Sequence, residues 1–281
     1  MSKNYLLEMD EDKYFADPCD KPSLSQSVAH TLLSRSPYHA WLEHPKLGGQ
    51  QRTATKAMDE GTILHSMLLG TDCKIEIIEH DDYRTDAAKL ARDTAILNGY
   101  IPVKEKDHER LQSCVTAVKK QLLDYDISLI GQKEGVLLWI ERDYKDRAVY
   151  CKARVDCFDG QMIIDLKSTG DAHPDAIKRR IVDGGYHTQA ATYIDAIARQ
   201  HPDLAGKLSS RDIFFETEPP YLVTVVELAD SFLTLGRQKW TAAINLWSQC
   251  LHENHWPAYG QVCLEAPAWA IAREMDGDII V

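Results

Sequence analysis

The stretch Arg154–Thr169, which reads RVDCFDGQMIIDLKST, decides how the rest of the chain is interpreted. Two apolar runs meet here at Asp159-Gly160, and apolar runs joined by Asp-Gly are a strong sequence signal for a β-hairpin. If Asp159 and Gly160 are the two turn residues, Phe158 faces Gln161. The sequence therefore predicts two antiparallel strands with a tight turn between them.

Two acids and one amine on the strands of this predicted hairpin are candidates for chemistry: Asp156, Asp165 and Lys167. Because side chains alternate along a strand, Asp165 and Lys167 share one face, and the predicted register places Asp156 diagonal to Asp165 on that face. Diagonal neighbours lie about 7–8 Å apart, within joint reach of one cation. Oxygen ligands without Cys or His suit Mg²⁺ or Mn²⁺. A structural Asp–Lys pair in a surface hairpin would give the same pattern, so the hairpin alone leaves both interpretations open.

Composition places the chain among ordinary globular proteins. It has 281 residues, 44% hydrophobic and 27% charged, which is enough to bury a sizeable core. No apolar run approaches the length of a membrane span, and no signal peptide is recognisable at the start. The seven cysteines contain no CxxC pair, so we expect free thiols in a reducing, cytoplasmic setting. The net charge of −11 argues against a general DNA coat, although a local basic groove could still bind DNA.

The order of patterns along the chain predicts one α/β (α+β) domain with a mixed central sheet flanked by helices. Residues 1–22 are acidic with few apolar anchors, and we interpret them as a flexible N-terminal arm before a single domain at 23–281. Tyr5, Leu6 and Leu7 could still dock on that domain. The tail from 254 onward carries Trp256 and Trp269, which we expect to pack as irregular cover. Strands are expected at 74–79, 134–144, 148–158, 163–167, 212–215 and 221–227, with helices before, between and after them.

A helix expected at 186–200 carries Tyr186, Gln189 and Tyr193 at spacings of three and four residues, so the three share one face. Hydroxyl and amide groups suit contact with sugar, phosphate or an unpaired base. A packing stripe of tyrosines with Gln at its rim would produce the same spacing.

Basic residues give further candidates for DNA contact. Arg35 lies between two serines at a predicted helix break, where a guanidinium and hydroxyls could form a phosphate pocket. Lys178 and Arg179 belong to a triple basic run with Arg180, and Arg154 precedes the first aspartate. A solvated surface is the alternative for each of these positions.

Taken together, these segments resemble the PD-(D/E)xK nuclease superfamily. Asp156 followed by Asp165-Leu166-Lys167 resembles its D…(D/E)xK core, and other segments are similar to the nuclease domain of exonuclease VIII (RecE-like) and its phage relatives, more distantly to lambda exonuclease and the RecB nuclease domain. The matching segments run in order from about residue 25 to about residue 270: SRSPYHAWL, EGTILHSMLLG, KARVD, IIDLKST, GYHTQAATYIDA, WPAY and APAWA.

The resemblance implies roles for further residues. His65 lies beside leucines, where an isolated histidine is most often a core residue, but the corresponding GTILH histidine of the family contributes to the metal site. The family's QxxxY motif corresponds to Gln189 and Tyr193. The implied site holds one or two Mg²⁺ (or Mn²⁺) with Asp156, Asp165, the Leu166 carbonyl and His65, while Lys167 positions the attacking water. The N-terminal helical region of lambda exonuclease helps bind the 5′ phosphate, which makes Arg35 a candidate for that contact.

The resemblance also implies an activity and partners: 5′→3′ digestion of linear duplex DNA to 5′-mononucleotides that leaves 3′ overhangs for recombination. A ring-shaped homo-oligomer (trimer or tetramer) would surround the duplex, and a single-strand annealing recombinase would act on the overhang. Two alternatives remain, a PD-(D/E)xK endonuclease and a catalytically silent DNA-binding or assembly module. The absence of GxSxG, HExxH and P-loop motifs excludes the usual forms of other hydrolases.

Overall fold

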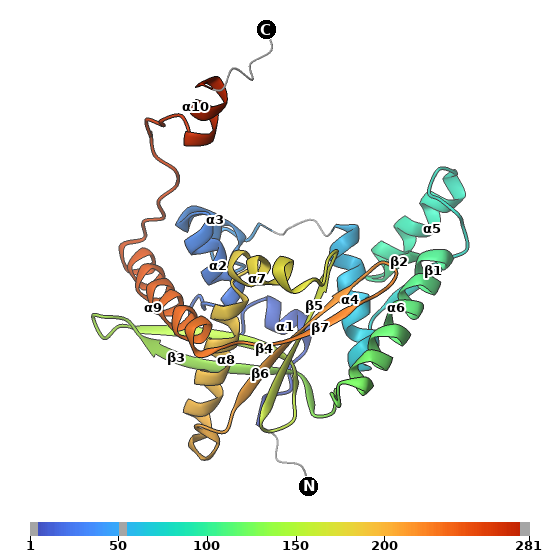
Figure 1. Cartoon of the computed structure of the whole chain (residues 1–281), viewed down its shortest axis with the longest axis horizontal. Helices are drawn as coiled ribbons and strands as arrows, with labels where there is room; N and C mark the ends of the chain where they lie inside the picture. Colours follow the sequence, from blue (N-terminus) through green and yellow to red (C-terminus); the bar gives the residue numbers. More distant parts are fainter. Residues whose placement is uncertain (1–4, 51–54, 276–281) are drawn as a thin grey trace.

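A five-stranded mixed sheet forms the centre of the molecule (Figure 1). The computed structural model describes residues 5–50 and 55–275. The strand order is β3-β4-β5-β6-β7, in which β5 and β6 are parallel and the other neighbours antiparallel. The strands are β3 (Gln132–Arg142), β4 (Ala148–Phe158), β5 (Met162–Thr169), β6 (Ser209–Glu216) and β7 (Val223–Glu227). This arrangement confirms the predicted α/β class with a mixed sheet.

Helices cover both faces of this sheet. One apolar cluster packs Ala29, Ile197 and Trp247 from the covering helices against β3 and β4. A second cluster packs helices against the opposite side of β5 and β6. The helices are α1 (Glu11–Phe15), α2 (Gln26–Ser34), α3 (Pro37–Glu43), α4 (Lys56–Leu69), α5 (Asp86–Leu97), α6 (Glu105–Asp124), α7 (Pro174–Asp183), α8 (Tyr186–Gln200), α9 (Asp230–Glu253) and α10 (Ala268–Met275).

Local sequence explains where several of these helices begin and end. The side chain of Ser25 accepts a hydrogen bond from an amide in the first turn of α2, and Ser36 does the same for α3, whose first residue is Pro37. Helix α4 ends at Gly70, whose φ of 69° is in the left-handed region that glycine adopts without strain. Each of these helix boundaries therefore follows from residues beside it in the sequence.

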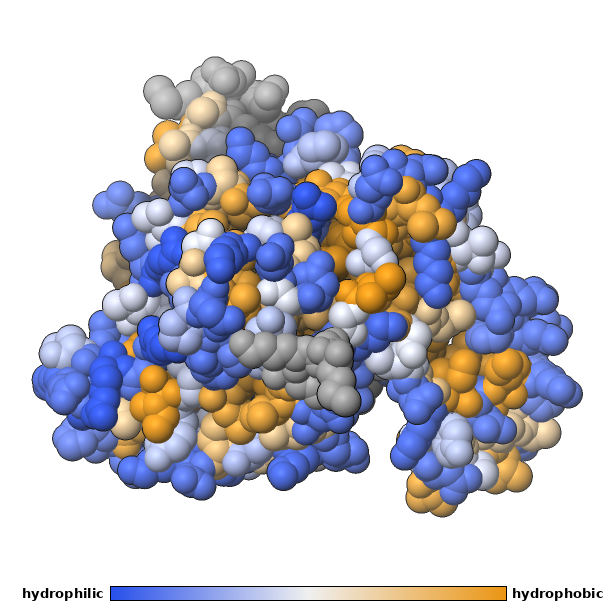
Figure 2. Space-filling model, turned by 90° about the horizontal axis from the view of Figure 1, so that it is seen from below, coloured by the Kyte–Doolittle hydropathy of each residue, from blue (hydrophilic) through white to orange (hydrophobic). Residues whose placement is uncertain are grey.

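A smaller lobe projects from the sheet through α4 and α6. It contains α5 and a two-stranded parallel sheet of β1 (Ile75–Ile78) and β2 (Ile101–Lys104). Figure 2 shows a notch between this lobe and the rest of the molecule. Strand β2 was not among the strands that the sequence predicted, because it is short and forms only through pairing with β1.

The hairpin at Asp159-Gly160 differs from its predicted register. Phe158 pairs with Ile163 rather than Gln161, so the turn is centred one residue later than expected. The Asp159 carboxylate accepts hydrogen bonds from two amides inside the turn, at 2.8 and 2.7 Å. Gly160, with φ of 105°, then occupies the first central position, where glycine is favoured. If this pairing continued by one more residue, Asp156 would lie opposite Asp165 and not diagonal to it.

Residues 5–22, where the sequence predicted a flexible arm, pack against the domain, whereas residues 1–4 lie outside the described part of the chain. Leu6 is buried, and Leu7 forms a bridge with Val136 of β3. Tyr14 of α1 is also buried, and its carbonyl accepts a hydrogen bond of 2.7 Å from Lys152. A few apolar anchors and buried polar contacts are enough to attach this acidic segment to the domain.

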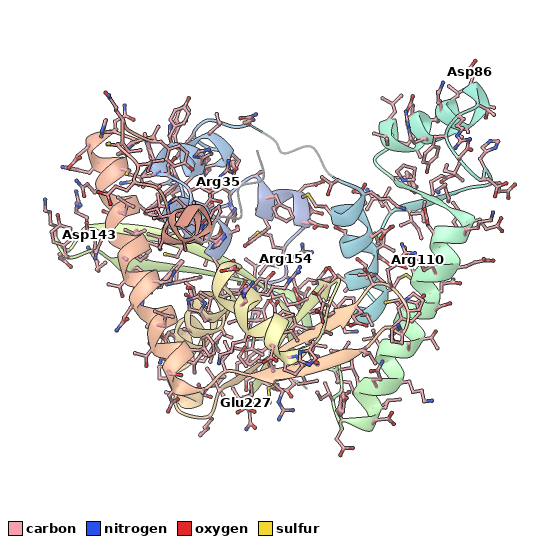
Figure 3. The ribbon with its side chains drawn as sticks, turned by 45° about the horizontal axis from the view of Figure 1, so that its top comes forward. Arg35, Asp86, Arg110, Asp143, Arg154 and Glu227 are labelled. Atoms are coloured by element: carbon pink, nitrogen blue, oxygen red, sulfur yellow. The ribbon has the colours of Figure 1, made fainter. Side chains whose placement is uncertain are left out.

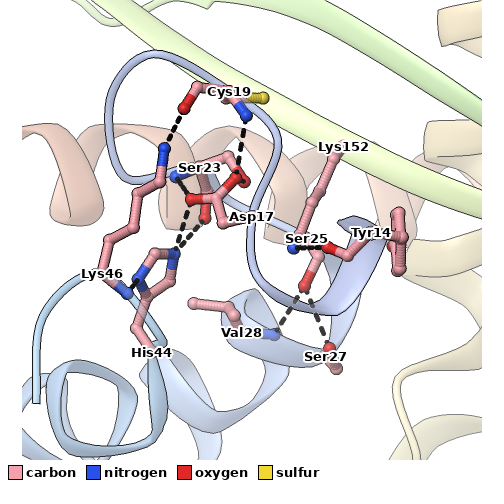
Figure 4. A network of polar contacts seen from close by, with 10 residues as sticks. All are labelled: Tyr14, Asp17, Cys19, Ser23, Ser25, Ser27, Val28, His44, Lys46 and Lys152. Atoms are coloured by element: carbon pink, nitrogen blue, oxygen red, sulfur yellow. Dashed lines mark hydrogen bonds and ion pairs between the residues drawn. The ribbon is translucent and has the colours of Figure 1, made fainter. Parts of the chain in front are cut away.

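The polar contacts that attach it converge on Asp17 (Figure 4). Its carboxylate accepts hydrogen bonds from the Ser23 hydroxyl at 2.7 Å and the Ser23 amide at 2.9 Å, and His44 lies 3.3 Å away. Burial by itself raises the pKa of Asp17, but the hydrogen bonds from His44 and Ser23 outweigh it and hold the pKa below its usual range. We call Asp17, Ser23 and His44 the N-terminal cluster.

The C-terminal tail is only partly the cover that the sequence predicted. Trp256 packs against Trp247, with ring centroids 5.1 Å apart. Trp269 instead lies on α10, away from the sheet, and is 66% exposed. Within residues 5–50 and 55–275, none of the helices has both the length and the apolar composition that crossing a bilayer requires.

Candidate active site

The site lies where β4 and β5 separate. Regular pairing between these strands is limited to Cys157 with Ile164 and Phe158 with Ile163. Beyond it, the Asp156 side chain takes the place of a main-chain partner and accepts a hydrogen bond of 2.8 Å from the amide of Leu166. The strand sequence thus places one carboxylate of the predicted core at a fixed position against the next strand.

Asp165 and Lys167 lie beside it on β5, both largely buried. The Lys167 ammonium contacts Asp165 Oδ2, while Asp165 Oδ1 accepts a hydrogen bond of 2.6 Å from Gln189 Nε2. The carbonyl of the same Gln189 amide accepts a hydrogen bond of 2.9 Å from Lys167. One glutamine on α8 therefore fixes both the acid and the amine.

Two tyrosines of α8 complete this wall of the site. The Tyr193 hydroxyl donates to the main-chain carbonyl of Arg154 at 3.1 Å and accepts from Gln189 Nε2 at 3.1 Å. The Tyr186 ring lies under Lys167, whose ammonium is 4.3 Å from the ring centroid. The predicted face of α8 is therefore turned toward the acids. Tyr186 contributes a cation–π contact, and Gln189 and Tyr193 contribute a chain of hydrogen bonds.

His65 reaches the same site from α4, on the other side. Its Nδ1 lies 3.5 Å from Asp156 Oδ2, and its side chain is 29% exposed. The structure thus brings together His65, Asp156, Asp165, Lys167 and Gln189, although they come from four separate elements.

The electrostatics of the site show a surplus of negative charge. Burial, followed by repulsion from Asp165, raises the pKa of Asp156 to about 6. Burial alone would lower the pKa of Lys167, but the surrounding carboxylates, Asp165 most strongly, raise it above its usual range. Repulsion between carboxylates thus adds to the effect of burial at Asp156, and attraction by the same carboxylates outweighs burial at Lys167.

Sequence reasoning missed one member of this group, Asp212. It lies on β6 in register with Asp165, and it is only 3% exposed. Burial raises its pKa to about 7, with Lys167 opposing that shift and Asp165 adding to it. An aspartate directly before the apolar run IFF was a usable signal, but only the parallel pairing of β5 with β6 shows that it joins the site.

The donor set fits a hard divalent cation. Asp156 and Asp165 repel one another, and Asp212 Oδ2 is buried without a hydrogen-bond partner, so positive charge is what the site needs. No group of three or more His, Cys, Asp or Glu side chains is arranged to hold a metal ion within the residues that the structure describes. Mg²⁺ rarely needs such a cage, because it binds through one or two carboxylates and keeps water or substrate phosphate as its other ligands.

The structure places the remaining predicted residues elsewhere or in other contacts (Figure 3). Arg35, beside α3, pairs with Glu43 at 2.9 Å. Lys178 and Arg179 lie on the exposed side of α7, outside the cluster. Arg154 lies nearer the middle of the molecule, where two carboxylates neutralise it: Glu11 of α1 at 2.8 Å and Glu134 of β3 at 3.0 Å.

Leu166 differs from the other predicted metal ligands because only its main-chain carbonyl could bind a cation. Its side chain is buried in the apolar cluster of α4 and α6, and its amide is occupied by Asp156. The role of its carbonyl in binding a cation stays a prediction, as do the individual roles of all the site residues.

Comparison with known proteins gives a family and a fold. A family model described as a PDDEXK-like domain of unknown function (DUF3799) matches residues 27–266, which confirms the predicted PD-(D/E)xK resemblance. A search of curated proteins found no match. Among solved structures, a candidate exonuclease from Eubacterium rectale is similar, with a TM-score of 0.64, 12% identity, and coverage of 97% of this chain and 100% of that one.

A phage-related exonuclease from Haemophilus somnus 129PT is also similar, with a TM-score of 0.32, 15% identity, and coverage of 68% of this chain and 95% of that one. At these identities, the likeness to the Eubacterium rectale protein shows a shared fold. The family model confirms the predicted PD-(D/E)xK core, while the narrower exonuclease VIII branch stays a prediction.

Proposed function

The chain belongs to the PDDEXK-like family DUF3799, and on this premise we propose that it is a Mg²⁺-dependent (or Mn²⁺-dependent) exodeoxyribonuclease. It digests linear duplex DNA in the 5′→3′ direction to 5′-mononucleotides and leaves 3′ single-stranded overhangs. The direction and the products rest on the resemblance to the exonuclease VIII branch, whereas phosphodiester hydrolysis rests on the site itself.

One observation carries the proposal: Asp156, Asp165 and Lys167 meet in one buried cluster whose surplus charge is negative. A purely structural Asp–Lys pair would be neutral and would not need two further carboxylates beside it. Gln189 and His65 also contact the two aspartates. Apolar residues at these two positions would pack at least as well, so their polar groups point to a role other than packing.

The residues divide the work of hydrolysis in a simple way. A divalent cation bound at the two carboxylates would polarise the scissile phosphate and lower the pKa of a water molecule. The Lys167 ammonium is then the group that orients the attacking water and offsets the charge that develops on the phosphoryl oxygens. Gln189 holds the lysine and Asp165 at a fixed separation, and Tyr193 holds Gln189.

Recognition of a DNA end requires positive charge outside this cluster. Lys178 and Arg179 are exposed on α7, while Arg180 of the same helix donates a 3.3 Å hydrogen bond to the carbonyl of Ser168, next to Lys167. Helix α7 therefore connects the exposed basic residues to the catalytic strand, and we assign it to the DNA path. Arg35 remains a candidate for the 5′ phosphate, because a phosphate could replace Glu43 as its partner.

The same proposal covers assembly. The resemblance implies a ring-shaped trimer or tetramer around the duplex and a single-strand annealing recombinase that acts on the 3′ overhang. Such a ring would keep the enzyme on the duplex while it digests processively from the end, and the recombinase would use the overhang that it leaves.

The test uses the full chain with two substrates, a 5′-phosphorylated linear duplex and a covalently closed circular duplex, each with Mg²⁺ or with EDTA. We expect loss of the linear substrate alone, release of 5′-mononucleotides, and no reaction in EDTA. Label on the 5′ end should be released before label on the 3′ end.

Two variants make the assay specific. Lys167→Ala should lower the rate of hydrolysis by about 100-fold or more, whereas Lys145→Ala, an exposed lysine of the β3–β4 turn, should leave it unchanged. Cutting of the closed circle would replace the proposal by an endonuclease, and binding of DNA without any product would replace it by a silent binding module.

A further inference from the structure

Asp212 is a buried carboxylate that the proposed chemistry does not use. It is 3% exposed, its Oδ2 atom has no hydrogen-bond partner, and none of the described residues forms an ion pair with it within 4 Å. Leaving such a group unpartnered is costly in a folded protein, so each case calls for an explanation. A neutral side chain of similar size would fill the same space in β6 without that cost.

The surroundings of Asp212 point to one positively charged neighbour. The charges that act on it most strongly are, in order, those of Lys167, Asp165 and Asp156. Asp212 is the register partner of Asp165 across the parallel strands β5 and β6, and adjacent strands lie about 4.8 Å apart. Lys167, two residues along β5 from Asp165, points to the same face. The ammonium therefore needs only a small movement of its side chain to pass from one carboxylate to the other.

Binding of a cation supplies the reason for such a movement. Lys167 now contacts Asp165 Oδ2, one of the oxygens that the cation needs. Two positive charges cannot share that oxygen at close range, so the ammonium has to withdraw. Gln189 and the Tyr186 ring remain as contacts, but neither carries a negative charge. A buried ammonium that loses its carboxylate needs another one.

We propose that Asp212 is a positioning residue that receives the Lys167 ammonium when Asp165 binds the divalent cation. This inference rests on the proposed function, since it assumes that Asp165 holds a cation during catalysis. In the metal-free protein the Lys167 ammonium contacts Asp165, and the Asp212 Oδ2 atom has no hydrogen-bond partner. In the loaded protein Asp212 holds the lysine beside the scissile phosphate and keeps it charged and ordered.

The direct test observes the ammonium itself and needs no DNA. In protein labelled with ¹⁵N-lysine and ¹³C-aspartate, Lys167→Ala identifies the Lys167 signal, and a coupling across the hydrogen bond identifies the carboxyl carbon that accepts it. Without metal we expect coupling to Asp165, and with saturating Mg²⁺ coupling to Asp212. Coupling that remains on Asp165 after Mg²⁺ binding would overturn the proposal.

A variant gives a second, independent readout. In Asp212→Asn without metal, the Lys167 signal should persist, because Asp165 still holds the ammonium. With Mg²⁺ the signal should broaden, because nothing charged replaces Asp165. Asp143→Asn is the matched control, a buried carboxylate bound to Arg147 in the β3–β4 turn, and it should leave the Lys167 signal unchanged in both states. A sharp Lys167 signal in Mg²⁺-loaded Asp212→Asn would contradict the proposal.

Kinetics and metal binding separate this role from two alternatives. Asp212→Asn should lower kcat about tenfold or more at unchanged KM, and should have no further effect in a Lys167→Ala background, because both changes act through one group. Its affinity for Mn²⁺ should stay within about threefold of wild type. Lost Mn²⁺ binding would make Asp212 a cation ligand, and additive rate losses would give it a role apart from Lys167.

The outcomes also distinguish failure of the inference from failure of the proposed function. A wild-type protein that shows the Mg²⁺-driven change of coupling but digests no DNA retains the inference and overturns the nuclease. A protein that digests DNA with the lysine fixed on Asp165 retains the nuclease and overturns the inference.

Discussion

Two buried polar clusters in this molecule are built from similar parts and show opposite electrostatics. In the N-terminal cluster, Asp17 accepts hydrogen bonds from Ser23 and lies beside His44, and its pKa is held below the usual range. In the candidate active site, the pKa values of Asp156 and Asp212 are raised, to about 6 and about 7. The first cluster has all the partners that it needs, whereas the second is short of positive charge.

The difference teaches how a structural site can be told from a functional one. Both clusters remove carboxylates from water, and that burial alone raises a carboxyl pKa. In a structural site, hydrogen-bond donors offset the buried carboxylate charge, as Ser23 and His44 do around Asp17. In the candidate active site, Asp212 Oδ2 is buried without a partner, which costs folding free energy. Only a ligand or a side chain that moves can offset that cost.

The largest expected contrast between the clusters is in catalysis. Asp165→Asn should lower the rate of DNA hydrolysis by about 100-fold or more, because it removes a charge that acts on the reacting phosphate. Asp17→Asn, the matched change in the other cluster, should leave kcat of the folded protein unchanged. Steady-state digestion of linear duplex at saturating Mg²⁺ measures both, and equal losses would remove the distinction.

Stability should show the reverse order. Asp17→Ala should lower the free energy of unfolding by about 3 kcal/mol, because it leaves His44 and Ser23 buried without their acceptor. Asp20→Ala, an exposed neighbour, should change it by less than about 0.5 kcal/mol. Urea unfolding at pH 7 measures the two values. A similarly small effect for both would show that residues 5–22 are not held by this cluster.

The pH dependence of stability should have opposite signs in the two clusters. Asp17 has a lowered folded pKa, so its contribution is complete at neutral pH and is lost as pH falls below about 4. Asp156 has a raised folded pKa of about 6, so metal-free protein should lose about 3 kcal/mol as pH rises from 4 through 6.

Urea unfolding between pH 4 and 8, in EDTA and in Mg²⁺, tests both signs. Mg²⁺ should remove the loss at higher pH in wild type, since the cation supplies the missing charge. In Asp156→Asn the loss should be smaller even in EDTA. A loss at higher pH that persists in Mg²⁺ would mean that the surplus charge is not satisfied by the cation.

The smallest expected effect concerns Arg154, which lies between the two clusters. Glu11 of the N-terminal segment neutralises it at 2.8 Å. Glu11→Gln should free part of its charge and strengthen binding of duplex DNA about threefold at low salt, with less effect at high salt. Fluorescence anisotropy measures this, and Glu8→Gln, also acidic and exposed, is the control. The same change for both would point to total charge instead of Arg154.

The sequence predicted what local pattern determines. The class of the fold, the capped helices α2, α3 and α4, and the grouping of Asp156, Asp165 and Lys167 follow from periodicity, caps and a hairpin signal, with the resemblance adding His65, Gln189 and Tyr193. The hairpin register was missed by one turn residue, because Asp159 uses its side chain to bind the turn amides.

Contacts between distant segments could not be predicted in this way. Asp212 joins the site only through the parallel pairing of β5 and β6, 47 residues apart in sequence at Asp165 and Asp212. The attachment of residues 5–22 depends on His44 and Gln132, which no local pattern connects to Asp17 or Tyr5. Both cases are tertiary contacts that override local composition.

The central claim is that Asp156 and Asp165 form a site short of one divalent cation. Titration of Mn²⁺ into the metal-free full-length protein, followed by calorimetry, measures this without reference to DNA or to activity. The account predicts that wild type binds Mn²⁺ and that Asp165→Asn does so at least about tenfold more weakly, while Asp17→Asn binds like wild type. Equal Mn²⁺ affinity for wild type and Asp165→Asn would contradict it.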